Sequence, residues 1–138
     1  MTDRKIFITE NDMWRLNRSF QITTALVGRN RQHFENLQEK LDRAEIVEPK
    51  KIPEDVITMN SQIRLKNLDT GEEMTYWLVF PDKTNVSPNA LSVLAPMGTA
   101  LLGYKEGDII ELDVPGGIKK LLVVEVIYQP ERLGNYEL

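Results

Sequence analysis

The sequence predicts an α+β protein in which a short antiparallel helical hairpin precedes an antiparallel sheet that carries one short helix. Two patterns along the 138 residues lead to this prediction. Apolar residues recur at helical spacings of three and four up to Ala44, and they alternate with polar residues from Gln62 onward. Pro49 and Pro53 interrupt both patterns. We therefore expect three parts: a hairpin in residues 1–48, a linker in residues 49–55 and a sheet domain in residues 56–138.

The hairpin is expected from two apolar stripes joined by a turn near Gly28. Thr9 is followed by Glu10 and Asp12, a pattern typical of a helix start, because a hydroxyl caps free amides and acids favour the positive end of the helix dipole. The two stripes should meet as the seam of a short coiled coil. The residues of this expected seam are Met13, Leu16, Phe20, Phe34, Leu37, Leu41 and Ala44.

The sheet domain is expected from five apolar or alternating runs separated by turn residues. Asp69-Thr70-Gly71 and Pro115-Gly116-Gly117 have the composition of tight turns. A further run, Met97 to Leu102, is long enough for one or two helical turns. The expected strands are Gln62–Leu68, Met74–Phe80, Leu91–Leu94, Ile109–Val114 and Leu121–Tyr128.

Composition excludes several classes of site. Cysteine is absent and there is one histidine, which excludes disulfides, thiolate metal sites and histidine-rich metal clusters. The net charge of −4 does not favour a sequence-specific nucleic-acid surface. No run approaches the roughly 18 apolar residues of a spanning helix, and the N-terminus lacks the apolar core of a signal peptide. We expect a cytoplasmic protein with no metal, no cofactor and no membrane partner.

Three runs carry a specific resemblance. They are LKNLDTGEEMTYWLVFPD, LSVLAPMGTALLGYKEGDIIELDVPGG and VVEVIYQP. They resemble the C-terminal domain of the bacterial Gre transcript cleavage factors, and the resemblance covers about residues 59–129. The resemblance implies an FKBP-like fold that docks on the rim of the RNA polymerase secondary channel. It also implies an N-terminal coiled coil, whose tip in Gre factors carries acidic residues that help to hold a catalytic metal.

The N-terminal part departs from the Gre pattern. The hairpin is short, and no acidic residue lies between Asp12 and Glu35. The segment LDRAEIVEPKKIPEDVITMNSQIRLKN, the pair Ala95-Pro96 and the ending YQPE instead resemble the regulator of nucleoside diphosphate kinase family, from about residue 5 to residue 138. That resemblance implies a polymerase-binding relative of Gre that lacks cleavage-stimulating activity.

The resemblance also points to candidate site residues. The Gre loop that contacts polymerase corresponds to Leu94, Ala95, Pro96 and Met97. Leu94 either makes an apolar contact there or ends a buried strand, and the residues leave both readings open. The expected hairpin tip comprises Ala25, Leu26, Val27, Gly28, Arg29 and Arg31.

The function expected from these features is non-enzymatic: binding to the rim of the RNA polymerase secondary channel, in competition with Gre factors. One alternative is a cleavage factor of the Gre type, against which the acid-free tip argues, because magnesium prefers carboxylate ligands. A remote alternative is a peptidyl-prolyl isomerase, suggested by the fold alone, which would need an aromatic-lined pocket.

Overall fold

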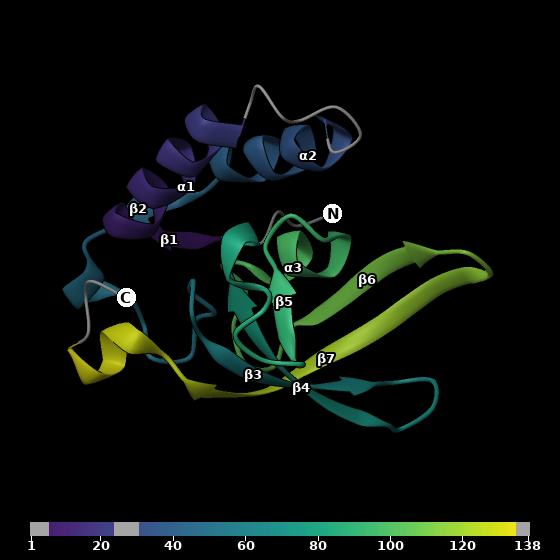
Figure 1. Ribbon diagram of the computed structural model, residues 1–138. Coiled ribbons are helices and arrows are strands. Elements are labelled where there is room, and N and C mark those ends of the chain that lie inside the picture. Colours follow the sequence, from purple (N-terminus) through teal and green to yellow (C-terminus); the bar gives the residue numbers. More distant parts are fainter. Residues whose placement is uncertain (1–5, 24–30, 135–138) are drawn as a thin grey trace.

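The computed structural model describes residues 6–23 and 31–134, and it confirms an α+β protein with a mainly antiparallel sheet (Figure 1). The helices are α1 (Glu10–Thr23), α2 (Arg31–Asp42) and α3 (Pro96–Leu101), and the short 3-10 turns are η3 (Pro49–Lys51), η4 (Pro81–Lys83) and η5 (Pro130–Leu133). The strands are β1 (Phe7–Thr9), β2 (Glu45–Val47), β3 (Gln62–Asn67), β4 (Glu73–Val79), β5 (Ala90–Ser92), β6 (Ile109–Val114) and β7 (Gly117–Tyr128).

A five-stranded sheet with the order β5-β4-β3-β7-β6 forms the body of the molecule. β3 pairs antiparallel with β4, and β6 pairs antiparallel with β7, as the two predicted turns imply. β3 also pairs antiparallel with β7, a neighbour that no local pattern predicted. At the β3–β4 turn Gly71 has a φ of +78°, a value that favours glycine because a side chain is strained there. β5 differs from the expected antiparallel arrangement, because it pairs parallel with β4. The connection between these two strands, residues 80–89, crosses over instead of turning tightly.

One face of the sheet, which we call the inner face, lies toward α3 and the two long helices (Figure 1). Ile63 and Leu65 of β3 point to this face and are fully buried. Leu16, Leu37 and Leu41 of α1 and α2 belong to the same buried cluster. The predicted burial of these three leucines is therefore confirmed, and they share one core with residues of the sheet. Met13 is half-buried against this core, whereas the side chains of Phe20 and Phe34 lie outside the described residues.

The base of the hairpin contains a small element that the sequence did not predict. β1 and β2 form a two-stranded parallel sheet directly before α1 and after α2, with Ile8 opposite Ile46. Three-residue strands are too short for their alternation to be recognised in a sequence. Thr9 ends β1 and caps α1 as predicted, since its Oγ1 accepts a hydrogen bond of 3.1 Å from the backbone N–H of Asp12.

The expected linker packs against the sheet domain. Ile52 is buried, and the fully buried Gln129 donates from Nε2 to the carbonyls of Pro53 and Val56 at 2.8 and 2.7 Å. These two bonds tie residues 53–56 to the end of β7. The division of the chain at residues 48 and 55 stays a prediction.

Candidate functional site

The segment from Ser92 to Met97 connects β5 to α3 and contains the four predicted docking residues. Two local hydrogen bonds to Ser92 shape its backbone. The Ser92 Oγ accepts from the Leu94 N–H at 3.1 Å, and the Ser92 carbonyl accepts from the Ala95 N–H at 3.0 Å. Pro96 then occupies the first turn of α3, where its missing N–H costs nothing. We call Leu94–Met97 the docking loop.

Contacts from α3 hold the docking loop from behind. The Thr99 Oγ1 donates to the Val93 carbonyl at 2.5 Å, and the Thr99 N–H donates to the Ala95 carbonyl at 2.9 Å. A Cβ atom at Gly98 would lie 2.1 Å from the Ser92 carbonyl oxygen, so only glycine allows this close approach. The loop and α3 therefore form one rigid unit.

The docking loop presents a mixed surface. Pro96 is exposed, while Leu94, Ala95 and Met97 are half-buried. Val93, the residue directly after β5, is fully buried, whereas Leu94 is not. Leu94 packs partly against the core and remains partly accessible. The sequence left open whether Leu94 makes an apolar contact at the surface or ends a buried strand, and its half-buried position is compatible with both interpretations.

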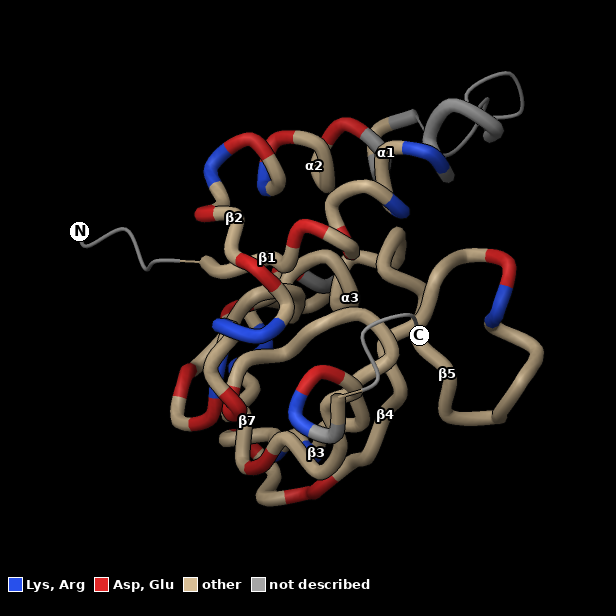
Figure 2. The backbone as a smooth tube through the Cα atoms, turned by 90° about the vertical axis from the view of Figure 1, so that its left-hand side faces the viewer, with Lys and Arg blue, Asp and Glu red and all other residues tan. Residues whose placement is uncertain are grey.

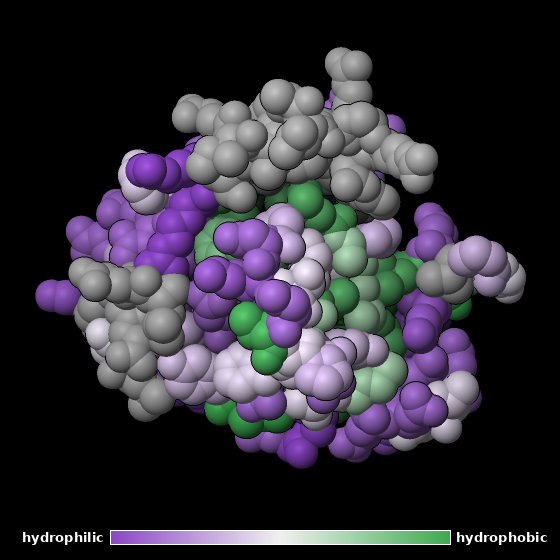
Figure 3. Space-filling model, viewed as in Figure 1, coloured by the Kyte–Doolittle hydropathy of each residue, from purple (hydrophilic) through white to green (hydrophobic). Residues whose placement is uncertain are grey.

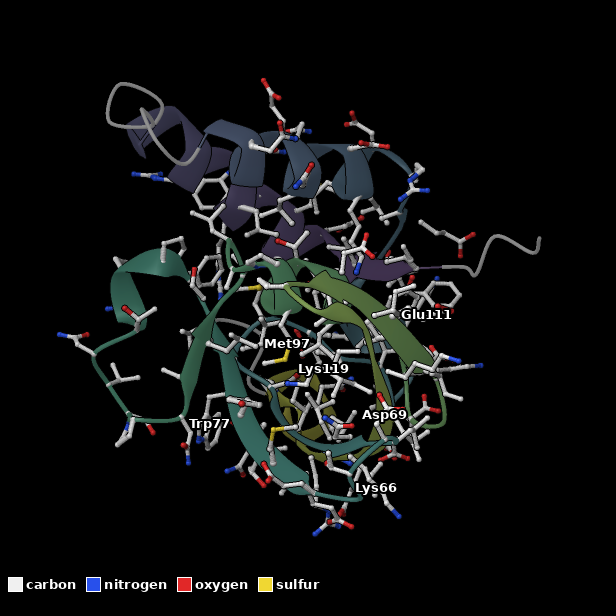
Figure 4. All side chains as sticks on the ribbon, turned by 90° about the vertical axis from the view of Figure 1, so that its right-hand side faces the viewer. Lys66, Asp69, Trp77, Met97, Glu111 and Lys119 are labelled. Atoms are coloured by element: carbon white, nitrogen blue, oxygen red, sulfur yellow. The ribbon has the colours of Figure 1, made fainter. Side chains whose placement is uncertain are left out.

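An apolar area adjoins the docking loop on the inner face of the sheet. Met74 and Tyr76 alternate with the buried Leu78, and Leu112 alternates with the buried Ile110, so all three point to the inner face. They are only half-buried, which shows that α3 and the hairpin cover this face incompletely. Figure 3 shows hydrophobic residues gathered beside α3, and Figure 4 shows Met97 and Lys119 on this open side.

Aromatic side chains are divided between the two faces of the sheet. Tyr76 points inward, whereas Trp77 lies opposite Gln62 and faces outward. Trp77 packs there against Tyr128 in a tilted arrangement, with 5.7 Å between the ring centroids and 58° between the ring planes. The aromatic residues of β4 and β7 therefore do not line one shared pocket on the inner face, which is the arrangement an isomerase would need.

The expected hairpin tip can be followed only in part. Ala25, Leu26, Val27, Gly28 and Arg29 lie outside the described residues, and Arg31 is the first residue of α2. Asp12, the last acid before the acid-free stretch, lies in the first turn of α1, at the base of the hairpin. It is 2% exposed, and its Oδ2 accepts from the Met59 N–H at 3.0 Å. It is therefore committed to the fold at the end of α1 opposite to the tip.

Asp12 belongs to a buried acid pair that the sequence did not reveal. Burial, and to a lesser extent the carboxyl of Glu131, raise the pKa of the Asp12 carboxyl to about 7, although the hydrogen bond from the Met59 N–H opposes the shift. Burial also raises the pKa of Glu131, whose Oε1 accepts from the Thr58 Oγ1 at 2.7 Å. The spacing of Thr9 and Asp12 is that of a capping motif, but the pairing with Glu131 depends on contacts 119 residues apart in the sequence.

Charged residues of both signs are interspersed over the backbone in the view of Figure 2. In residues 6–23 and 31–134, no group of three or more histidine or acidic side chains is placed to hold a metal ion. Within the same ranges, no helix is long and apolar enough to cross a membrane.

The fold and the site define an α+β protein of two parts, a short helical hairpin and a curled, mainly antiparallel sheet. Residues 52–128 match the family model described as transcription elongation factor, GreA/GreB, C-terminal. Since this match spans more than half of the chain, the protein belongs to the GreA/GreB C-terminal family.

Two relatives and one solved structure support this membership. The chain is 47% identical over 103 residues to the regulator of nucleoside diphosphate kinase from Escherichia coli, covering 74% of this chain and 76% of the relative. It is 36% identical over 99 residues to the transcription elongation factor GreA of Thermotoga neapolitana, covering 72% of this chain and 63% of that protein. A solved structure of a transcription elongation factor GreA/GreB from Nitrosomonas europaea superposes with a TM-score of 0.72 and 38% identity, covering 90% of this chain and all of that one.

Proposed function

We propose that this protein is a cytoplasmic, non-enzymatic transcription regulator that binds RNA polymerase at the rim of the secondary channel through its docking loop. Membership of the GreA/GreB family and the similarity to the regulator of nucleoside diphosphate kinase support a role in transcription. The observation that carries the proposal is Pro96, which is exposed at the start of α3 on a segment held rigidly by bonds to Ser92 and Val93. A loop ordered before binding loses little conformational freedom when a partner docks.

The proposal excludes direct stimulation of transcript cleavage. A Gre-type contribution to metal binding needs carboxylates at the hairpin tip, and the sequence has none between Asp12 and Glu35. The carboxyl of Asp12 is buried and accepts a hydrogen bond from the Met59 N–H. The protein would instead occupy the rim in competition with longer Gre factors.

Substitution of Pro96 tests the docking loop. Pro96→Glu should weaken capture by core RNA polymerase about tenfold or more, because it places an unpaired charge in the contact. The fold should remain, since glutamate is well tolerated at the first position of a helix. The measurement is a pull-down with immobilised core polymerase, repeated with a competing Gre factor, together with a thermal melt.

Pro88→Glu is the matched control, because Pro88 is an exposed proline in the β4–β5 connection and outside the docking loop. It should bind as the unmodified protein does. Equal capture of Pro96→Glu and Pro88→Glu at equal thermal stability would show that the docking loop is not the contact. No capture of the unmodified protein would reject polymerase as the partner.

A further inference from the structure

Lys40 of α2 is the one lysine among the described residues that is buried, with 6% of its surface exposed. Its Nζ donates to the carbonyls of Thr99 and Ala100, both at 2.6 Å, and lies 4.4 Å from the centre of the Tyr104 ring. The two carbonyls belong to the C-terminal turn of α3, where carbonyl groups lack partners within the helix and where a cation is favoured. The side chain of Lys40, from the hairpin, thus caps the C-terminal carbonyl groups of α3.

The other end of α3 is the docking loop. α3 has six residues, from Pro96 to Leu101, so its two ends are about 9 Å apart. Thr99 takes part at both ends: its side chain and N–H hold Val93 and Ala95, and its carbonyl accepts from Lys40. A displacement of Lys40 is therefore transmitted to the unit that carries the docking loop.

Each long helix of the hairpin makes a buried polar contact with the rest of the molecule. In α1 this contact is made by Asp12, which accepts from the Met59 N–H, and in α2 it is made by Lys40. The apolar contacts of Leu16, Leu37 and Leu41 add stability, but hydrophobic burial has no directional preference, whereas a pair of short hydrogen bonds does. With Lys40 removed, α2 loses both of its hydrogen bonds to the end of α3, and its direction relative to α3 is less restricted.

We propose that Lys40 is the positioning residue that sets the direction of the helical hairpin relative to the docking loop, by holding the C-terminal end of α3. The role given to the loop rests on the proposed function, whereas the attachment of the hairpin does not. A regulator that docks by its sheet domain delivers its hairpin to a defined place only if the two parts keep a fixed angle. Lys40 fixes that angle through its two hydrogen bonds from α2 to α3.

The attachment does not depend on one charge state of Lys40. Burial, together with the nearby guanidinium of Arg43, lowers the pKa of Lys40 to about 7. The neutral amine still has two N–H groups, one for each carbonyl. The contact with α3 therefore persists on both sides of neutral pH.

Distance measurements between spin labels test the positioning role in the free protein. The chain has no cysteine, so Asn36→Cys on α2 and Glu72→Cys in the β3–β4 turn place two labels at exposed sites without competing thiols. Double electron–electron resonance should give one narrow distance distribution. Lys40→Met, which keeps the length of the side chain and removes its donors, should shift and broaden that distribution.

Lys50→Met is the matched control, since Lys50 is exposed in η3, and it should leave the distribution unchanged. Lys40→Arg, which keeps donors and charge, should restore much of the narrow distribution. If Lys40→Met does not fold, Lys40→Gln takes its place with the same expectation, because its shorter amide cannot reach both carbonyls. A folded Lys40→Met or Lys40→Gln with an unchanged distribution would overturn the positioning role.

A pull-down separates this inference from the proposed function. If polymerase does not capture the unmodified protein, the proposed function fails, while a broadened distribution in Lys40→Met still supports Lys40 as the residue that orients the hairpin. If polymerase captures the protein and the distribution of folded Lys40→Met stays narrow, the proposed function stands and the inference about Lys40 fails.

Discussion

Asp12 has an unusually high pKa for a residue in the first turn of a helix, because it is buried and the carboxyl group of Glu131 is nearby. Its pKa is about 7 in the folded protein against an ordinary value of 3.8. As the pH rises from about 4 to 7, the unfolded chain loses this proton while the folded protein retains it. The free energy of unfolding should therefore fall over that interval by up to about 4 kcal/mol from this group, and this contribution should be constant above it.

Asp12→Asn tests that pH dependence, because asparagine can still accept from the Met59 N–H and does not ionise. Relative to the unmodified protein, the variant should gain stability as the pH rises from 4 to 7, measured by urea unfolding at several pH values. Asp69→Asn, at an exposed turn position, should follow the unmodified protein throughout. Parallel profiles for Asp12→Asn and the unmodified protein would show that the buried carboxyl does not titrate as the structure indicates.

At the level of elements, the hairpin depends on the leucines that α1 and α2 place in the common core. Leu41 is 2% exposed and Leu37 is fully buried. Leu41→Ala should lower the free energy of unfolding by ~2–4 kcal/mol, through lost burial and the cavity left behind. Leu68→Ala, at a position 40% exposed, should cost about 1 kcal/mol or less. Urea unfolding measures both, and a loss well under 1 kcal/mol for Leu41→Ala would mean that α2 does not pack as described.

For the whole molecule, two features argue against stimulation of cleavage at the metal of the polymerase active site. The hairpin helices are short, and the sequence has no acidic residue between Asp12 and Glu35. α1 and α2 have 14 and 12 residues, or about 21 and 18 Å at the rise of an α-helix. We expect no shortened RNA when this protein alone is added to backtracked elongation complexes, at any magnesium concentration. We also expect it to inhibit cleavage stimulated by a Gre factor, by competition for the rim. Cleavage by the protein alone would refute the non-enzymatic role.

A double substitution separates missing chemistry from missing reach. Ala25→Asp with Gly28→Glu introduces two acids into the expected tip, which lies outside the described residues. If the hairpin is too short to reach the polymerase active site, this variant should remain inactive in the same cleavage assay. Recovery of cleavage would show that the hairpin reaches the metal and that carboxylates alone were absent.

Local patterns were sufficient to predict the helices and most strands. Apolar residues at spacings of three and four mark the buried side of each helix, because that side must face a core. Leu16 belongs to this stripe in α1, and Leu37 and Leu41 belong to it in α2. The alternation around Ile63 and Leu65 marks the inner face of β3 for the same reason. β1 and β2 are too short to show a period, and the parallel pairing of β5 depends on the path of a crossover, which no local pattern encodes.

By itself, the sequence determined the α+β class, the order of hairpin and sheet, the caps and turns, and the absence of acids between Asp12 and Glu35, because each depends on residues close together in the chain. Only the tertiary structure decided that Asp12 is buried, accepts a hydrogen bond from the Met59 N–H and lies near the carboxyl of Glu131. It also decided that Lys40 donates to the C-terminal carbonyls of α3. In the sequence both residues resemble ordinary charges on a solvated helix. Their roles arise from groups 47 to 119 residues away, which burial brings together and deprives of water.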